Sequence, residues 1–285
     1  MSDNLLKIFY SGIGGSGTSA LALFDSMRGH EVSGSDRAFD QDPNHPAYAP
    51  LKAAGIKILP QDGSGIESSL DFAVMSTAVE DDTPEVVRAK ELGVLIKRRP
   101  EYLAEIVSDY KTIAVSGTSG KSTASGMLAY AMRKLGMGPN FLGGGRVKQF
   151  RSATNPGNCL KGSSDLLVIE ACESDGTIVN YRPEHTVLLN LSLDHKGLIE
   201  TARMFQTLAS NTAGRVFVNA DDERLAEISI SNAVTFSVDK SSDLKAENIA
   251  LKPLGLEFSV SGVRFSLRQP GKYNIYNALS AVAVL

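Results

Sequence analysis

Residues 116–123 read Ser-Gly-Thr-Ser-Gly-Lys-Ser-Thr, and these residue types are the ones that bind phosphate. Glycines let backbone N–H groups turn toward phosphate oxygens, a lysine adds positive charge, and a hydroxyl after the lysine can ligate Mg²⁺. Val115 stands where the longer form of this pattern has glycine, so the motif is a short form. The residues expected to contact the phosphates are Gly117, Thr118, Ser119, Gly120, Lys121, Ser122 and Thr123.

Acidic residues follow two later apolar runs, residues 166–169 and 187–190. These residues and the one histidine beside them are Glu170, Glu173, Asp175, Asp194 and His195. In a doubly wound sheet ligands bind outside the carboxyl ends of the strands, where the phosphate loop also lies, so the acids and His195 can converge on that loop if the strands are neighbours. Mg²⁺ prefers oxygen ligands, which Glu170 and Ser122 can supply together. His195 could complete a metal site, bind Mn²⁺ or polarise a water.

A second glycine cluster, G-I-G-G-S-G, lies between an apolar run at residues 5–10 and a helical pattern through Met27. A strand at residues 31–35 and then Asp36 follow at the spacing of a dinucleotide-binding βαβ unit. We expect a ribose-bearing diphosphate at this helix N-terminus, with Asp36 meeting a hydroxyl. A UDP-sugar and NAD both fit that description. The predicted loop residues are Gly12, Ile13, Gly14, Gly15, Ser16 and Gly17.

Composition narrows the class of protein. The 285 residues carry a formal net charge of −3, which gives no reason to expect nucleic-acid binding through a basic surface. The two cysteines, Cys159 and Cys172, do not suggest a disulfide framework or a metal-binding spacing. The polar N-terminus predicts no signal peptide, and no apolar run approaches the length of a membrane span. We therefore expect a cytoplasmic protein.

Strands and helices alternate along most of the chain, which predicts an α/β fold of two doubly wound domains. The boundary is expected in a polar joint before the phosphate-loop strand, giving domains 1–108 and 109–285. Short alternating runs between residues 234 and 267 are typical of antiparallel strands and would extend the second domain. The expected strands cover residues 5–10, 31–35, 71–75, 95–97, 112–115, 166–171, 186–191 and 215–219. The expected helices cover residues 20–27, 84–92, 99–107, 124–135, 200–211, 222–228 and 275–285.

Taken together and in order, these motifs resemble the Mur ligase family over essentially the whole chain. The first glycine cluster with Asp36 resembles its Rossmann-like UDP-sugar domain, and residues 76–79 with 83–85 resemble its second substrate loop. The loop at 116–123 resembles its ATP loop and marks a P-loop central domain. Further blocks that resemble the family are E-A-C-E-S-D at 170–175, Asn190 through His195, and G-K-Y-N-I-Y-N-A-L at 271–279.

This resemblance implies an ATP- and Mg²⁺-dependent ligase of peptidoglycan precursor synthesis that joins L-alanine to UDP-N-acetylmuramate through an acyl phosphate. It implies catalytic roles for Lys121, Glu170 and His195, and metal binding by Ser122, Glu170 and His195. It also implies adenine contacts from Asn274 and Asn277, and UDP-sugar contacts from Ser76 and Thr77 besides the first loop. Neither nucleic acid nor membrane is expected as a partner.

The chain departs from the family pattern at three places. Cys172 replaces an acid, Lys196-Gly197 follow His195 where an acid is frequent, and Tyr273 replaces a histidine. Family members also carry a third, C-terminal domain beyond the last block present here, so we expect this chain by itself to be inactive in ligation. Two alternatives stay open: a recycling ligase that joins a murein peptide to UDP-N-acetylmuramate, and an NAD-dependent oxidoreductase that uses the first glycine loop.

Overall fold

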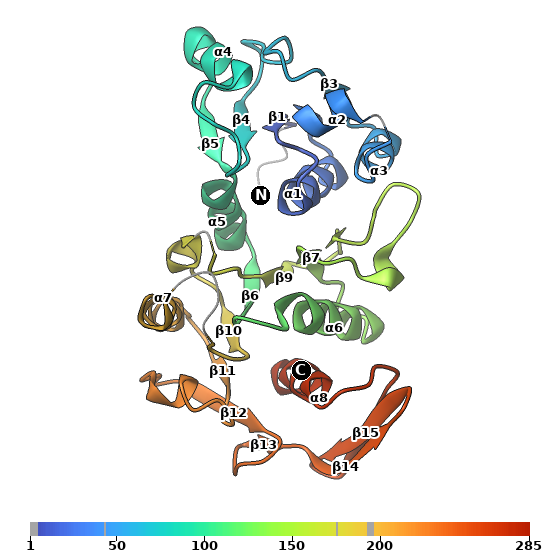
Figure 1. The fold of residues 1–285 in the computed structure, drawn as a ribbon, viewed down its shortest axis with the longest axis vertical. Coiled ribbons are helices and arrows are strands. Elements are labelled where there is room, and N and C mark those ends of the chain that lie inside the picture. Colours follow the sequence, from blue (N-terminus) through green and yellow to red (C-terminus); the bar gives the residue numbers. More distant parts are fainter. Residues whose placement is uncertain (1–4, 43, 175, 193–196) are drawn as a thin grey trace. The chain divides into compact units, whose positions relative to one another are not determined.

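The structure is a computed structural model that describes residues 5–42, 44–174, 176–192 and 197–285. It divides into two compact units (Figure 1). The first consists of Met1–Ile106 and Asn140–Ser163, and the second of Val107–Pro139 and Ser164–Leu285. Within the described ranges, no helix is long and apolar enough to cross a membrane.

The first unit contains a parallel sheet with strand order β3-β2-β1-β4-β5. Its strands are β1 (Lys7–Ser11), β2 (Glu31–Ser35), β3 (Lys57–Leu59), β4 (Phe72–Met75) and β5 (Ile96–Arg98). The central strands β1 and β4 are almost wholly buried, as expected for a sheet covered on both faces. The strand order reverses direction between β1 and β4, which is where ligands bind in open α/β sheets.

Helices of the first unit follow these strands. They are α1 (Ser16–Met27), α2 (Arg37–Gln41), α3 (Tyr48–Ala53), α4 (Pro84–Leu92) and α5 (Arg99–Asp109). Proline in its first turn and left-handed Gly93 at its end bound α4. Residues 140–163 add β7 (Asn140–Leu142), a 3₁₀ turn (Lys148–Phe150) and β8 (Cys159–Leu160). Asn158 joins this segment to α1 by donating to the Ser16 carbonyl at 3.0 Å.

The second unit contains parallel strands in the order β13-β12-β11-β10-β6-β9. They are β6 (Lys111–Ser116), β9 (Leu166–Glu170), β10 (His185–Leu188), β11 (Val216–Asn219), β12 (Ala233–Ser237) and β13 (Leu244–Lys245). An antiparallel sheet follows, made of β14 (Glu247–Lys252), β15 (Gly255–Val260) and β16 (Val263–Leu267). The position of β6 between β10 and β9 decides which loops meet at the phosphate loop.

The helices of the second unit are α6 (Lys121–Lys134), α7 (Leu198–Ser210) and α8 (Tyr273–Val284). Short 3₁₀ turns occupy Thr177–Asn180 and Leu225–Glu227. Helix α8 packs against α6, β11 and β12, and Figure 1 shows α8 in red beside α6 in green. The apolar side chains of α8, with Ile275 and Leu279 fully buried, account for this packing.

The predicted fold class is confirmed by the strand order of both units, and most predicted elements lie where the sequence places them. Two predictions were wrong. The helix expected at residues 222–228 is a turn with a 3₁₀ segment, because the Asp222 carboxylate accepts from the N–H groups of Arg224 and Leu225. The antiparallel region begins later than expected, since β12 and β13 continue the parallel sheet.

Candidate functional site

The phosphate loop follows β6 and leads into α6, as the motif predicts. Two of its glycines have positive φ, +146° at Gly117 and +84° at Gly120, a region that side chains rarely tolerate. A Cβ on Gly117 would lie 2.9 Å from Cβ of Leu189, so the loop runs directly against the end of β10. Glycine is therefore required at both positions for the loop to take this shape.

Lys121 is buried and bends back over the loop that precedes it. Its ammonium group donates to the Gly117 carbonyl at 2.7 Å and pairs with the Glu173 carboxylate at 2.9 Å. Glu173 is also buried, so the two charges neutralise each other inside the protein. The lysine thus sits at the phosphate loop with a carboxylate as its counter-ion.

The hydroxyl of Ser122 and the carboxylate of Glu170 meet at the neighbouring carboxyl end of β9. Ser122 Oγ donates to Glu170 Oε1 at 2.9 Å. Both are oxygen donors, and Ser122 is exposed to solvent, which suits a Mg²⁺ ion that keeps several of its waters. Among the described residues no group of three or more acids, histidines or cysteines could hold a metal ion, and the metal site predicted at Ser122 and Glu170 remains a prediction.

Part of the predicted acidic cluster cannot be placed. His195, with Asp175 and Asp194, lies outside the described residues. Cys172 stands at the position where the family pattern has an acid. Its Sγ atom lies 3.0 Å from Ser174 Oγ. The described residues thus bring together Lys121, Ser122 and Glu170, while the part assigned to His195 stays a prediction.

The predicted adenine-side residues, Asn274 and Asn277, are both buried on α8. Asn277 donates to Asn274 Oδ1 at 3.2 Å, and Asn274 donates to the Pro270 carbonyl at 2.8 Å. The amide oxygen of Asn277 lies 2.6 Å from the position that a Cβ on Gly120 would occupy. The structure therefore places Asn277 against the phosphate loop, and the predicted adenine contact remains a prediction.

The predicted loop of the first unit connects β1 to α1 and lies beside the ends of β2 and β4. Gly12 and Ile13 donate their N–H groups to the Ser35 carbonyl at 2.9 and 3.1 Å, and the Ile13 side chain is buried. A Cβ on Gly12 would lie 2.7 Å from Cβ of Ser76, so the loops that follow β1 and β4 touch. Thr77 beside Ser76 is exposed. N–H groups left for a ligand come from the first turn of α1, at Ser16 and Gly17.

Asp36 takes part in holding this loop in place. Its carboxylate accepts from the Gly14 N–H at 2.7 Å and from the Ala38 N–H at 2.9 Å, which caps α2. Each carboxylate oxygen can accept a further hydrogen bond, so a ligand hydroxyl remains compatible with this arrangement. The sequence predicted that Asp36 contacts a ribose hydroxyl, but it did not predict the hydrogen bonds that Asp36 accepts from Gly14 and Ala38.

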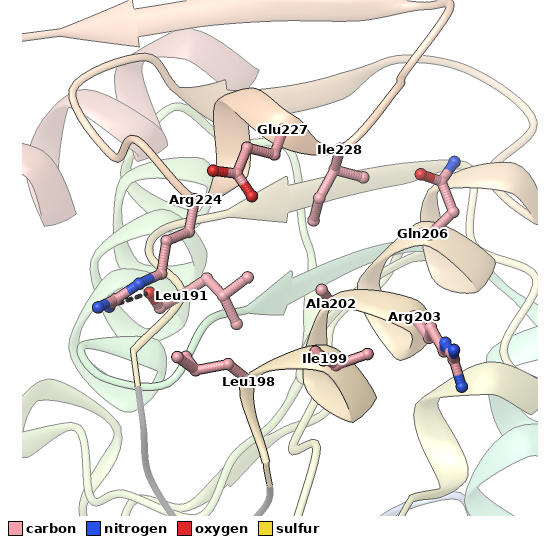
Figure 2. A pocket seen from close by; sticks show the side chains of 9 residues that line it. All are labelled: Leu191, Leu198, Ile199, Ala202, Arg203, Gln206, Arg224, Glu227 and Ile228. Atoms are coloured by element: carbon pink, nitrogen blue, oxygen red, sulfur yellow. Dashed lines mark hydrogen bonds between the residues drawn. The ribbon is translucent and has the colours of Figure 1, made fainter.

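A pocket of about 510 Å³ lies between α7 and the 3₁₀ turn at Leu225–Glu227. Figure 2 shows apolar side chains of α7 facing Ile228, with Arg203, Gln206, Arg224 and Glu227 around them. Arg224 donates to the Leu191 carbonyl at 3.2 Å, which joins this wall to the loop that follows β10. No predicted phosphate- or metal-binding residue of the described chain lines this pocket.

Two further features carry no assignment from sequence reasoning. Asn190 contacts the phosphate loop with its side chain and its backbone. The available signal was its place at the end of the apolar run 187–190, comparable to the place of Glu170 after the run 166–169. In the first unit, buried Asp25 accepts from the hydroxyls of Tyr10 at 2.6 Å and Tyr102 at 2.8 Å. No local pattern marks that cluster, because its members come from three separate elements.

The fold and these loops define an α/β protein that combines a Rossmann-like unit with a phosphate-loop unit. Family comparison agrees and is more specific. The pattern of the Mur ligase family, catalytic domain, matches residues 8–111, and that of the Mur ligase middle domain matches residues 115–285. The chain belongs to the Mur ligase family.

Similar proteins include two curated UDP-N-acetylmuramate–L-alanine ligases. The one from Caldicellulosiruptor saccharolyticus is 34% identical over 98% of this chain and 62% of its own length. The one from Dictyoglomus turgidum is 34% identical over 99% of this chain and 61% of its own length. The chain therefore spans about three fifths of the length of these relatives.

Solved structures show the same likeness. The UDP-N-acetylmuramate-alanine ligase of Thermotoga maritima matches with a TM-score of 0.84 and 29% identity, over 98% of this chain and 64% of that chain. The UDP-N-acetylmuramate:L-alanyl-gamma-D-glutamyl-meso-diaminopimelate ligase of Neisseria meningitides matches with a TM-score of 0.82 and 25% identity. This match covers 98% of this chain and 93% of that chain. These matches cover both units described above.

Proposed function

We propose that this chain binds ATP and UDP-N-acetylmuramate and serves an ATP-dependent ligase that joins L-alanine to the muramate carboxylate. The observation that carries the proposal is the meeting of Lys121, Ser122 and Glu170 at the carboxyl ends of β6 and β9. The names of the curated relatives support the substrates. We place this activity in the cytoplasm, where ATP is available.

The proposed reaction has two steps. An oxygen of the muramate carboxylate attacks the γ-phosphorus of ATP, ADP leaves, and an acyl phosphate forms. The amino group of L-alanine then attacks the acyl carbon, loses a proton and expels inorganic phosphate, which leaves an amide. A bound Mg²⁺ ion would neutralise negative charge on the phosphates.

The residues of this chain would contribute by positioning and by charge. Lys121 would exchange Glu173 for the outer phosphates, so that its positive charge faces the transferred group. Ser122 and Glu170 would hold the metal at the same end of the sheet. In the first unit, the N–H groups at the start of α1 would face the diphosphate of the UDP-sugar.

Titration calorimetry tests the proposal on this chain. We expect one site for MgATP and one for UDP-N-acetylmuramate, with ATP binding that weakens strongly when EDTA removes magnesium. Absence of heat for both ligands, at concentrations where the chain is folded, would contradict the proposed function. If the chain binds UDP-N-acetylmuramate but does not bind MgATP, the proposal holds only for the first unit.

The nature of the acceptor is tested separately, because one similar structure is named as a ligase of a peptide rather than of L-alanine. Mass spectrometry of reactions containing ATP, Mg²⁺ and UDP-N-acetylmuramate compares L-alanine with the tripeptide L-alanyl-γ-D-glutamyl-meso-diaminopimelate. With this chain by itself we expect negligible product from either acceptor, and multiple-turnover formation of an amide would contradict that expectation. A product with the tripeptide alone would replace the proposed amino-acid ligase by the recycling ligase.

A further inference from the structure

Asn190 contacts the phosphate loop more extensively than any sequence pattern suggests. It follows β10, the neighbour of β6, so its side chain reaches the loop across the sheet edge. Its Oδ1 accepts from the Ser119 N–H at 2.9 Å and from the Thr118 hydroxyl at 2.9 Å. Its Nδ2 donates to the Ser119 carbonyl at 2.9 Å, and its own carbonyl accepts from the Thr118 N–H at 3.1 Å.

These contacts engage both peptide groups of Ser119 at once. A side-chain amide carries a donor and an acceptor side by side, so it can pair with the N–H and the C=O of one residue as a neighbouring strand would. Ser192 reinforces the arrangement, since its N–H donates to Thr118 Oγ1 at 3.0 Å. Aspartate at position 190 would keep the acceptor but lose the donor, and alanine would lose both.

The hydrogen bonds of Asn190 to Thr118 and Ser119 form a clamp on the phosphate loop. This clamp also decides which backbone N–H groups remain to bind phosphate. The N–H groups of Thr118 and Ser119 already have acceptors in Asn190. The first-turn N–H groups of a helix have no acceptor within the helix, and in α6 these begin directly after Gly120. The phosphates are therefore expected at the start of α6, beside Lys121, with Thr118 and Ser119 serving as the supported wall of the loop.

We propose that Asn190 is a positioning residue that holds the phosphate loop in its binding shape before nucleotide arrives and so raises the affinity for nucleotide phosphates. The inference deepens the proposed function and rests on ATP binding at this loop. A loop that is already ordered loses less conformational entropy when the ligand binds. Removing the clamp should therefore weaken binding even though Asn190 itself need not touch the nucleotide.

The first measurement requires no ligand. Hydrogen–deuterium exchange of the free chain should show faster exchange in the peptide that contains Ser119 in Asn190→Ala than in the wild type, with β6 unchanged. Asn211→Ala is the matched control, because that asparagine also donates its side-chain amide to a backbone carbonyl, Val179 O at 2.9 Å, which does not belong to the phosphate loop. Equal exchange of the loop in Asn190→Ala and wild type would overturn the clamp, whatever the nucleotide does.

The second measurement is the affinity for MgATP and MgADP by calorimetry. We expect Asn190→Ala to weaken both about tenfold, and Asn190→Asp to weaken both further because it also brings negative charge toward the phosphates. Asn211→Ala should remain within twofold of wild type. Faster loop exchange with unchanged affinity would overturn the positioning role. Failure of the wild type to bind nucleotide would instead reject the proposed function, while the exchange data would still report on the clamp.

Discussion

The ammonium group of Lys121 is paired with the Glu173 carboxylate inside the protein, and the effects of substituting either residue depend on this ion pair. A buried ion pair adds little net stability, but removing one partner leaves an uncompensated charge. The Glu173 carboxylate therefore occupies the electrostatic role that nucleotide phosphates would take over. Two predictions follow from that exchange of partners.

Lys121→Ala should abolish measurable MgATP binding. Losing a charged contact to phosphate of this kind costs about 2–4 kcal/mol, or roughly 30- to 1,000-fold in affinity. Calorimetry checks the loss, and Lys134→Ala, at the exposed end of the same helix, serves as the control. Equal affinity in the wild type and Lys121→Ala would remove the loop from the ATP site.

Glu173→Gln should destabilise the free chain more than the nucleotide-bound chain. Without ligand, Lys121 loses its counter-ion, which costs on the order of 3 kcal/mol. With MgATP bound, the phosphates supply the missing negative charge, so the rise in melting temperature on adding MgATP should exceed that of the wild type. Scanning calorimetry with and without MgATP measures both shifts. An equal or smaller ligand-induced shift in the variant would show that Glu173 and phosphate do not share Lys121.

At the scale of elements, Asp25 joins three pieces of the first unit. It projects from α1 and accepts from Tyr10 of β1 and Tyr102 of α5, while Arg28 lies 3.3 Å away. Burial raises the pKa of the Asp25 carboxyl above its ordinary value of 3.8, and the two tyrosine hydrogen bonds and Arg28 only partly offset this. Asp25, Tyr10 and Tyr102 thus hold a helix, a strand and a second helix together through one buried carboxyl.

This cluster predicts a pH dependence whose sign follows from the raised pKa. Between pH 3.8 and the folded-state pKa, the folded chain holds a proton that the unfolded chain has released. The stabilisation that this proton provides is therefore lost as pH rises through the folded-state pKa. Asp25→Asn cannot titrate, so its melting temperature should gain relative to wild type as pH rises from about 4 to 7. A constant difference across that range, measured by scanning calorimetry, would contradict the assignment.

At the scale of the whole chain, each unit presents a glycine-containing loop at the carboxyl edge of its own parallel sheet. The two loops differ in what supports them. In the first unit Asp36 holds Gly14, and in the second Asn190 holds Ser119. Each unit can therefore be probed with its own ligand.

UDP-N-acetylmuramate should raise the melting temperature, whereas NAD(H) should not. A ligand at 100 times its dissociation constant adds about 2.7 kcal/mol, a shift that thermal denaturation resolves easily. Stabilisation by NAD(H) alone would favour the oxidoreductase alternative.

The sequence by itself determined the local units of this protein. The strand, glycine loop and helix at β6–α6 and at β1–α1 were predictable, because backbone freedom, apolar periodicity and helix-start residues are properties of short segments. The α/β class was predictable for the same reason. The convergence of Glu170 on Ser122 was predicted on the condition that their strands are neighbours, and the pairing of β6 with β9 meets that condition.

Only the tertiary structure decided the partners across strands. The side chain of Asn190 clamps Ser119 because β10 lies next to β6, and residues 140–163 belong with the first unit rather than the second. The Asp222 carboxylate likewise accepts from the Leu191 N–H at 3.0 Å, in the loop that follows β10. Such contacts join residues far apart in sequence. Which of them form depends on strand order and side-chain packing, and the local periodicity of the sequence carries no information about either.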